Sequence, residues 1–207
     1  MIKDWVPQYT QNDLQIVKEL EVYPGYLLVK QFQIKFRLFE GGMSHVVHRE
    51  LLFRPPAAVV LLFDSKLDQV VMIEQIRMGA IQDESPWILE LVAGVIDDGE
   101  NPEFTAHREA EEEAGCVLLS LIPICTYLVS PGISTEKTFV YCGMVDSPSG
   151  GTFHGLAEDG EDIKVHVLKR EMAYQLVTEG KITSASAIIA LQWLQLNHKD
   201  ILSKESL

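Results

Sequence analysis

The stretch that decides the fold is GVIDDGENPEFTAHREAEEEAGC, residues 94–116. Its second half predicts a helix. Asn101 is a favourable N-terminal cap, and Pro102 suits the first helical position. Gly115 should end the helix just after Ala114, because glycine readily adopts the left-handed conformation that terminates helices. The first half, which contains Asp-Asp-Gly, is predicted to be a loop.

Carboxylates crowd one face of this predicted helix. Glu109, Glu112 and Glu113 are spaced i, i+3 and i+4, so all three project from the same side. Each like-charged pair costs a few tenths of a kcal/mol, and no basic residue follows one turn later. Such a cluster suits a hard divalent cation, and magnesium in particular bridges a few carboxylates to substrate phosphates. The alternative is an acidic, solvated face on an acidic protein.

The spacing of the whole stretch resembles the signature box of the Nudix hydrolases. The chain agrees with the box at seven fixed positions, which are Gly94, Glu100, Arg108, Glu109, Glu112, Glu113 and Gly115. Ala110 stands where a larger aliphatic residue is usual, and Cys116 ends the box. Both are small and apolar, so these departures concern only the packing beneath the helix.

The resemblance implies an α/β fold, a Nudix-type α/β/α sandwich with mixed sheets. It also implies hydrolysis of a nucleoside diphosphate linked to another group, with magnesium, or alternatively manganese, as cofactor. By similarity Glu109 and Glu113 are the principal metal ligands, Glu112 assists, and the carbonyl of Ala93 is a further ligand.

The resemblance also assigns supporting roles. Arg108 would orient the glutamates, and Glu100 would fix the loop. The long acidic loop before residue 163 would supply a further metal ligand, Glu161, and a general base, which is either Asp159 or Glu161. A flexible loop can deliver such a carboxylate after substrate binds. Asp159 is shorter than the glutamate more usual at its position, so the choice of base stays open; the alternative is an ordinary solvated loop.

Features outside the box resemble the ADP-ribose diphosphatase branch of the family. A proline about fifteen residues beyond the box marks that branch, and Pro131 fits. The other matching segments are an N-terminal β extension ending near Phe53, together with Glu74–Arg77, Glu90–Gly94, Ser130–Gly132 and the tail that runs from Glu161 through Leu194.

Four residues are predicted to bind substrate. Arg77 ends a predicted strand, where a guanidinium could clamp a diphosphate bidentately; the alternative is a surface salt bridge. The resemblance implies that Arg49 and Tyr26 sandwich the adenine, partly from the other subunit, and that Glu136 contacts the ribose side. The alternatives are a core or cross-strand aromatic for Tyr26 and a solvated carboxylate for Glu136.

Alternating apolar residues and turn signals set the expected organisation. Residues 1–53 form an N-terminal β region for dimerisation and base contacts, and residues 54–207 form the catalytic domain that holds the box, 94–116. Strands are expected at 14–22, 26–39, 46–53, 57–63, 69–77, 87–92, 118–128, 138–144 and 163–168. Helices are expected at 102–114, 170–178 and 184–197, and residues 145–162 are expected to form a long loop.

Composition excludes several classes of function. The 207 residues include 17 Lys and Arg against 30 Asp and Glu, a net charge of −13. Such a chain is unsuited to binding nucleic acid or an anionic membrane through charge. Three scattered cysteines fit neither a disulfide framework nor a zinc cluster, and no histidine has the spacing of a zinc site. No signal-like or membrane-spanning run is present, so we expect a cytoplasmic protein.

These observations predict an enzyme that hydrolyses ADP-ribose to AMP and ribose 5-phosphate. The alternatives are the same chemistry on another sugar nucleotide such as GDP-mannose, a non-catalytic nucleotide-binding domain, and a calcium-binding module. The last is disfavoured because Asp97–Glu100 lacks alternating ligands. We also expect a homodimer, because the long strands before residue 53 leave apolar faces and open edges that a second chain would cover. The alternative is a monomer.

Overall fold

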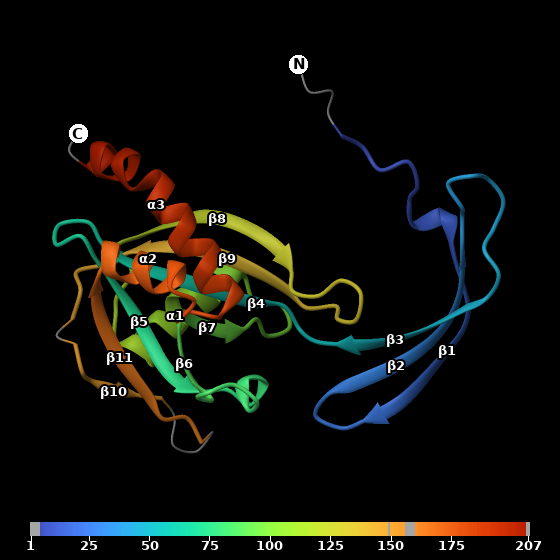
Figure 1. Ribbon diagram of the computed structural model, residues 1–207, viewed down its shortest axis with the longest axis horizontal. Coiled ribbons are helices and arrows are strands. Elements are labelled where there is room, and N and C mark those ends of the chain that lie inside the picture. Colours follow the sequence, from blue (N-terminus) through green and yellow to red (C-terminus); the bar gives the residue numbers. More distant parts are fainter. Residues whose placement is uncertain (1–4, 149, 156–159, 206–207) are drawn as a thin grey trace. The chain divides into compact units, whose positions relative to one another are not determined.

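The structure is a computed structural model that describes residues 5–148, 150–155 and 160–205 (Figure 1). The chain divides into two compact units. We call the first the N-terminal unit; it comprises Met1–Pro55 and Leu128–Glu136. We call the second the sandwich unit; it comprises Pro56–Tyr127 and Lys137–Leu207.

The N-terminal unit contains an antiparallel sheet of three strands in the order β1-β2-β3. The strands are β1 (Leu14–Pro24), β2 (Leu28–Phe36) and β3 (Val47–Phe53), and a single 3-10 turn (Gln11–Asp13) precedes them. Residues 128–136 join this sheet, since the Leu52 amide donates to the Ile133 carbonyl at 2.8 Å. Every residue of β1 is exposed, although several are apolar.

The sandwich unit contains a mixed sheet with the strand order β10-β11-β5-β4-β9-β8, with β6 paired to β5 and β7 paired to β4. Its strands are β4 (Ala57–Asp64), β5 (Gln69–Ile76), β6 (Trp87–Glu90), β7 (Val92–Val95), β8 (Ser120–Leu128), β9 (Lys137–Met144), β10 (Phe153–His154) and β11 (Ile163–Lys169). A second 3-10 turn (Met78–Ala80) follows β5. The central strand β4 runs parallel to β9 and antiparallel to β5 and β7.

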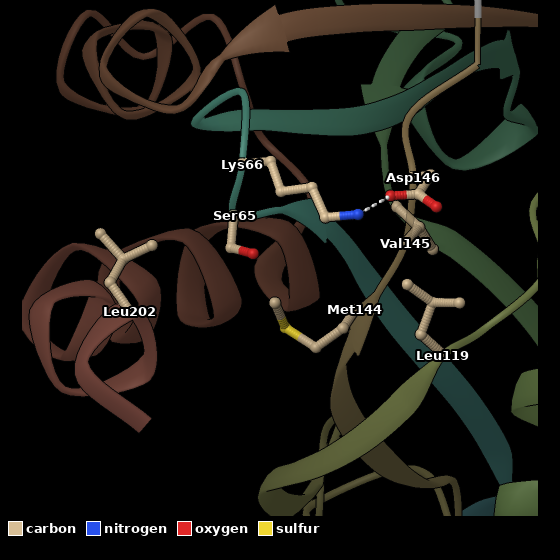
Figure 2. Close-up of a pocket in the computed structure, with 7 residues that line it drawn as sticks. All are labelled: Ser65, Lys66, Leu119, Met144, Val145, Asp146 and Leu202. Carbon is tan, nitrogen blue, oxygen red and sulfur yellow. Dashed lines mark hydrogen bonds and ion pairs between the residues drawn. The ribbon is translucent and has the colours of Figure 1, made fainter. Parts of the chain in front are cut away.

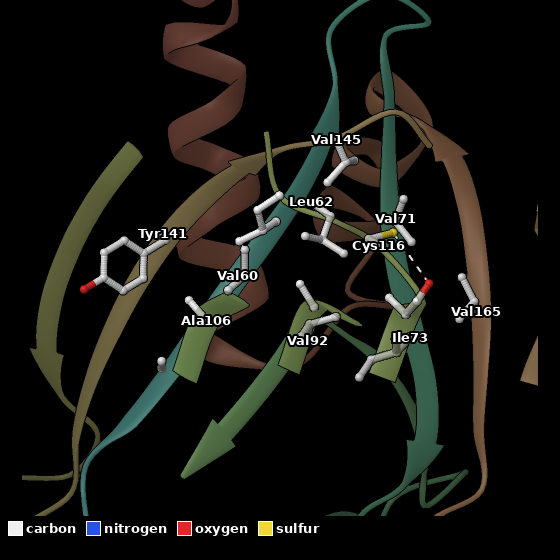
Figure 3. Packing of buried hydrophobic residues seen from close by; sticks show 14 of the residues in the cluster. Val60, Leu62, Val71, Ile73, Val92, Ala106, Cys116, Tyr141, Val145 and Val165 are labelled. Atoms are coloured by element: carbon white, nitrogen blue, oxygen red, sulfur yellow. Dashed lines mark hydrogen bonds between the residues drawn. The ribbon is translucent and has the colours of Figure 1, made fainter. Parts of the chain in front are cut away.

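Three helices cover the two faces of this sheet: α1 (Pro102–Ala114), α2 (Arg170–Thr178) and α3 (Ala185–Glu205). Alternate residues of β4 enter two separate cores. Val60 and Leu62 belong to the cluster that includes the alanines of α1, part of which Figure 3 shows. Leu61 and Phe63 belong to the cluster that includes α2 and α3. The predicted α/β/α sandwich with mixed pairing is therefore confirmed.

The structure differs from the sequence predictions in three elements. The strand expected at 87–92 is two short strands, because the chain changes partner at the buried Leu91 and passes from β5 to β4. The loop expected at 145–162 contains the short strand β10, which pairs with β11. Helix α3 continues to Glu205, beyond the expected end at 197. Within the described part of the chain, no helix combines the length and apolar character needed to cross a bilayer.

Candidate active site

Helix α1 carries the box residues Glu109, Glu112 and Glu113, and its ends form as the sequence predicts. The Asn101 side chain accepts a hydrogen bond from the Glu103 amide at 2.9 Å, which satisfies one of the free N–H groups at the helix start. Gly115 ends the helix with φ +63°, in the left-handed region. The buried face of α1 packs on the sheet through Ala106, Ala110 and Ala114.

Glu113 lies on this buried side of α1 and is only 4% exposed. Its Oε2 accepts a hydrogen bond from the amide of Ala93 on β7, at 2.9 Å. Burial raises the pKa of Glu113 to about 8, and the nearby charges of Glu109 and Glu161 act in the same direction. The Ala93 hydrogen bond and the charge of Arg77 oppose this rise without cancelling it. Glu113 is thus a buried carboxylate whose negative charge is incompletely compensated.

Arg108 holds the other box carboxylates. Its Nη1 lies 2.7 Å from Glu109 and 3.1 Å from Glu112, and its Nη2 lies 3.7 Å from Glu100. Burial raises the pKa of Glu109, although the Arg108 charge partly opposes this. Arg108 therefore supplies a positive charge next to the glutamates, although no basic residue follows them one turn further along the helix.

Glu100 closes the loop that leads into α1. Its Oε2 accepts hydrogen bonds from the Thr105 hydroxyl at 2.8 Å and from the Asp97 amide at 3.4 Å. The Thr105 hydrogen bond is the main cause that lowers the pKa of Glu100. The loop is therefore tied to the first turns of the helix by one carboxylate.

Gly94 explains why the box begins with glycine. It lies on β7, opposite Ala58 of β4, with its backbone fixed by the sheet. A Cβ placed there would overlap the carboxylate of Glu109, beginning with Oε1. A larger residue would push away one of the predicted metal ligands.

The donor chemistry of these residues fits a hard divalent cation. The negative charge of Glu161 contributes to the raised pKa of both Glu109 and Glu113, and the charge of Glu109 also contributes to the raised pKa of Glu113. A bound cation would relieve this repulsion. Among the described residues, no three acidic, histidine or cysteine side chains already converge as a metal cluster. In this arrangement the carboxylate of Glu109 is paired with the guanidinium of Arg108. To bind a cation, Glu109 would have to release Arg108.

Glu161 lies in the acidic loop, two residues before β11 begins. Its side chain is exposed, and its charge raises the pKa of both Glu109 and Glu113. The other candidate base, Asp159, lies outside the residues that the structure describes, as does its neighbour Glu158. The structure thus brings Glu161 towards the predicted ligands.

Arg77 stands at the end of β5 and pairs with Glu90 at the end of β6. Its Nε lies 2.6 Å from Glu90 Oε1. Its positive charge also lowers the pKa of Glu113, so Arg77 lies beside the predicted metal ligands. No sequence pattern assigns Glu90 a role of its own. The two residues are 13 positions apart, and only the pairing register of two strands brings them together.

The N-terminal unit gathers two of its predicted residues around an arginine that was not predicted. Tyr26, in the turn between β1 and β2, is 91% exposed and so is not a core aromatic. Its ring centroid lies 5.8 Å from the Arg54 guanidinium, within cation–π range. Arg54 Nε lies 4.0 Å from the carboxylate of Glu136. No sequence pattern distinguishes Arg54.

Arg49 lies elsewhere in the same unit. It is exposed on β3, opposite Phe32 of β2, and its Nη1 donates to the His48 carbonyl at 2.8 Å. It borders a hollow of about 480 Å³ whose lining is largely apolar and includes Leu14 and Ile16. Within this unit the structure therefore does not bring Arg49 and Tyr26 into direct contact.

The sandwich unit also contains a hollow. It measures about 530 Å³ and is bordered by the ion pair between Lys66 and Asp146 and by apolar side chains such as Met144 (Figure 2). None of the predicted site residues lines it. The chemistry that the box offers is thus not located in this hollow.

Comparison with known proteins agrees with the geometry. The NUDIX domain model matches residues 53–189. The chain is 47% identical over 192 residues to the ADP-ribose pyrophosphatase of Escherichia coli (strain K12), covering 92% of each chain. It is 27% identical over 187 residues to the GDP-mannose pyrophosphatase of Enterobacter sp. (strain 638), covering 89% of this chain and 96% of the relative.

A solved structure supports the fold. The crystal structure of an ADP compounds hydrolase superposes with a TM-score of 0.65 and 19% identity, covering 88% of this chain and 95% of that one. The domain match spans the box and both helical faces of the sandwich, and the resemblance predicted from the motif is confirmed. The chain belongs to the Nudix hydrolase family.

Proposed function

We propose that this protein hydrolyses the diphosphate of ADP-ribose to AMP and ribose 5-phosphate in the presence of a divalent cation. The observation that carries the chemistry is the complete glutamate box on α1, with Glu113 buried and held by the Ala93 amide. The substrate is inferred from the name of the Escherichia coli relative, which shares nearly half of the sequence over almost the full length.

The box residues hold the cation in this proposal. Glu109 and Glu113 are the principal ligands, and Glu112, Glu161 and the Ala93 carbonyl complete the set. Magnesium is the expected ion, with manganese as the alternative. When bound, such a cation neutralises phosphate oxygens and lowers the pKa of a water molecule.

A carboxylate of the acidic loop removes the proton from the attacking water. Glu161 is the favoured base because its charge already influences Glu109 and Glu113. Asp159 is the alternative. Water adds to one phosphorus of the diphosphate, the bridging P–O bond breaks, and the proton passes to the loop carboxylate. Arg108 orients Glu109 and Glu112, the glutamates with which it pairs in the structure.

We assign four predicted residues to substrate binding. Arg77 is the diphosphate clamp, which a strongly acidic protein needs because its net charge of −13 repels an anionic substrate. Arg49 and Tyr26 contact the adenine, and Glu136 contacts the ribose side. Arg54 supports Tyr26 and Glu136, since it lies beside both.

We further propose a homodimer in which the N-terminal unit helps to build the partner's nucleotide site. Apolar residues on β1 remain exposed within one chain, among them Ile16, Val17 and Leu20. An apolar edge strand of this kind invites coverage by a second copy. Arg49 and Tyr26 would then act on the nucleotide of the partner.

The three cysteines are free thiols, which supports a cytoplasmic location.

Turnover of a small substrate panel tests the proposal. ADP-ribose, GDP-mannose and NADH are each incubated with magnesium, and AMP or the corresponding nucleotide is quantified. We expect ADP-ribose to give the highest kcat/KM and chelation of the metal to abolish turnover. A preference for GDP-mannose would select the alternative substrate class. Binding without turnover of any compound would indicate the non-catalytic alternative.

A further inference from the structure

The pair formed by Arg77 and Glu90 has a feature that the roles assigned above leave unexplained. Glu90 is only 8% exposed, and burial raises its pKa, although Arg77 opposes this rise. A buried carboxylate is costly unless it is paired. Its partner, Arg77, is partly exposed and lies beside the predicted metal ligands.

The pairing uses only one edge of the guanidinium. The hydrogen bond of 2.6 Å runs from Nε of Arg77 to Oε1 of Glu90. Within the described residues, neither Nη of Arg77 donates a hydrogen bond. Arginine binds phosphate best with two parallel N–H groups. A pair formed through Nε therefore fixes the side chain and leaves both Nη groups for an anion.

The sheet register explains why Glu90 can reach this position. Glu90 on β6 lies opposite Ile73 on β5. Ile73 and Gln75 alternate along β5, and Arg77 follows directly with an extended backbone, so the three residues share one face. Glu90 therefore faces the same side as Arg77, and the cluster that contains Ile73 also contains the alanines of α1.

A second buried polar group, Gln75, lies beside Glu90. Gln75 is 5% exposed, and its amide lies near enough to lower the pKa of Glu90. Its Nε2 forms no hydrogen bond of good geometry with any described residue. A buried amide in this position is expected to complete its hydrogen bonding with the carboxylate beside it. Gln75 therefore places a buried amide donor beside Glu90, in addition to the hydrogen bond from Arg77.

We propose that Glu90 is a positioning residue that holds Arg77, with Gln75 behind it, so that the two Nη groups of Arg77 grip the diphosphate. The inference rests on the proposed diphosphate hydrolysis and adds to it the residue that orients the clamp. Glu90 itself touches neither the substrate nor the metal.

A double-mutant cycle tests this role, with Glu90→Ala, Arg77→Ala and the double variant assayed on ADP-ribose with magnesium. We expect Glu90→Ala to raise KM about 10- to 100-fold, the range for losing a hydrogen bond to a charged group. The double variant should be no worse than Arg77→Ala, because Glu90 acts through Arg77. Glu90→Gln, which keeps an acceptor for Nε, should restore most of the affinity.

Controls separate positioning from a general loss of structure. Glu74→Ala removes a carboxylate from the other face of β5, where it pairs with His166 at 2.8 Å, and should leave KM unchanged. The thermal midpoint and the magnesium affinity of Glu90→Ala should stay near those of the wild type. Independent, multiplicative losses in the double variant, or an unchanged KM in Glu90→Ala, would overturn the inference.

Failure of the proposed hydrolysis can be told apart from failure of the positioning role of Glu90. If the wild type does not hydrolyse ADP-ribose, the clamp is measured instead by calorimetric binding of ADP in the presence of magnesium. Coupled losses of ADP affinity in the same variants would support the positioning role without the hydrolysis. Losses of ADP affinity that are independent and multiplicative in the double variant would overturn the positioning role.

Discussion

Two properties of Glu113 are in conflict at the scale of a single residue. It is buried and therefore prefers to be neutral, yet a metal ligand must be charged. The Ala93 amide supplies one hydrogen bond to the charged form, and burial still raises the pKa to about 8. The metal-free protein therefore keeps a proton at this position under neutral conditions.

Glu113→Gln should reduce turnover by roughly a thousandfold or more, because the variant keeps the shape and loses the charge that a metal ligand supplies. The fold should survive, since a neutral amide suits the buried position. Turnover at saturating magnesium measures the loss. Glu111→Gln, an exposed position on the same helix, is the matched control and should stay near wild type. A nearly active Glu113→Gln would remove this residue from the ligand set.

The same conflict predicts a pH effect on the metal-free protein. The pKa of Glu113 is about 4.5 when unfolded and about 8 when folded, so the folded state binds the extra proton between these values. Stability contributed by the protonated form is complete below about pH 4.5, declines as the pH rises, and is lost above about pH 8. The wild type should therefore lose up to about 5 kcal/mol relative to Glu113→Gln across this window.

Denaturant unfolding of both proteins without metal measures this difference. Magnesium binding at pH 7 should also release about one proton from the wild type, because the ligand must be deprotonated. Calorimetry in two buffers of different ionisation enthalpy counts the proton. A difference between the two proteins that does not change with pH would show that Glu113 is ionised throughout.

At the scale of elements, β7 and α1 meet at Gly94. Gly94→Ala should sharply lower turnover while the fold persists, because the new Cβ would displace the Glu109 carboxylate rather than any backbone atom. A weakened response to magnesium should accompany the loss. Gly79→Ala, where an added Cβ meets nothing within 4 Å, is the control. Equal, mild effects in both variants would mean that Glu109 is free to move aside.

The loop before β11 gives a second prediction at this scale. Glu161→Gln should lower kcat far more than Glu158→Gln, because Glu161 is the loop carboxylate whose charge reaches Glu109 and Glu113. Glu158 lies outside the described residues and serves as the matched change in the same loop. Rates measured at saturating ADP-ribose and magnesium decide the matter. Similar, small losses would place the base elsewhere.

Local signals account for what the sequence could predict about these elements. Asn101 and Gly115 set the ends of α1, because capping depends on the residues at the ends themselves. The partner change at Leu91 could not be predicted, since it depends on which neighbouring strand is free to pair. Glu90 and Arg54 were missed for a similar reason. Their partners are set by strand register and by the approach of a loop distant in sequence.

At the scale of the whole molecule, we expect a dimer at micromolar concentration in analytical ultracentrifugation. Ile16→Lys should weaken it, because the substitution places a charge on the exposed apolar β1. If the partner's nucleotide site depends on this unit, KM for ADP-ribose should rise in parallel. Lys18→Gln, on the same exposed strand, is a control that removes a charge without adding one. A wild-type monomer with an ordinary KM would contradict this arrangement.

Deleting residues 1–50 tests the same arrangement more severely. The truncated chain retains the whole box and the whole region matched by the domain model, 53–189. We expect weaker association and weaker ADP-ribose binding. A truncated monomer with unchanged KM would show that the N-terminal unit contributes nothing to the site.

The place of β4 in the sheet has a consequence for amide hydrogen exchange. Seven of its eight residues are buried, and its backbone is paired along both edges. Its amides should therefore exchange last, at the free energy of global opening. β7, which carries Ala93, pairs directly with this slowest strand, whereas Glu161 precedes β11 near the edge of the sheet. Magnesium that joins the two regions should slow exchange in β11, and it should slow exchange in β4 as well, because a cation that binds only the folded state raises the free energy of global opening.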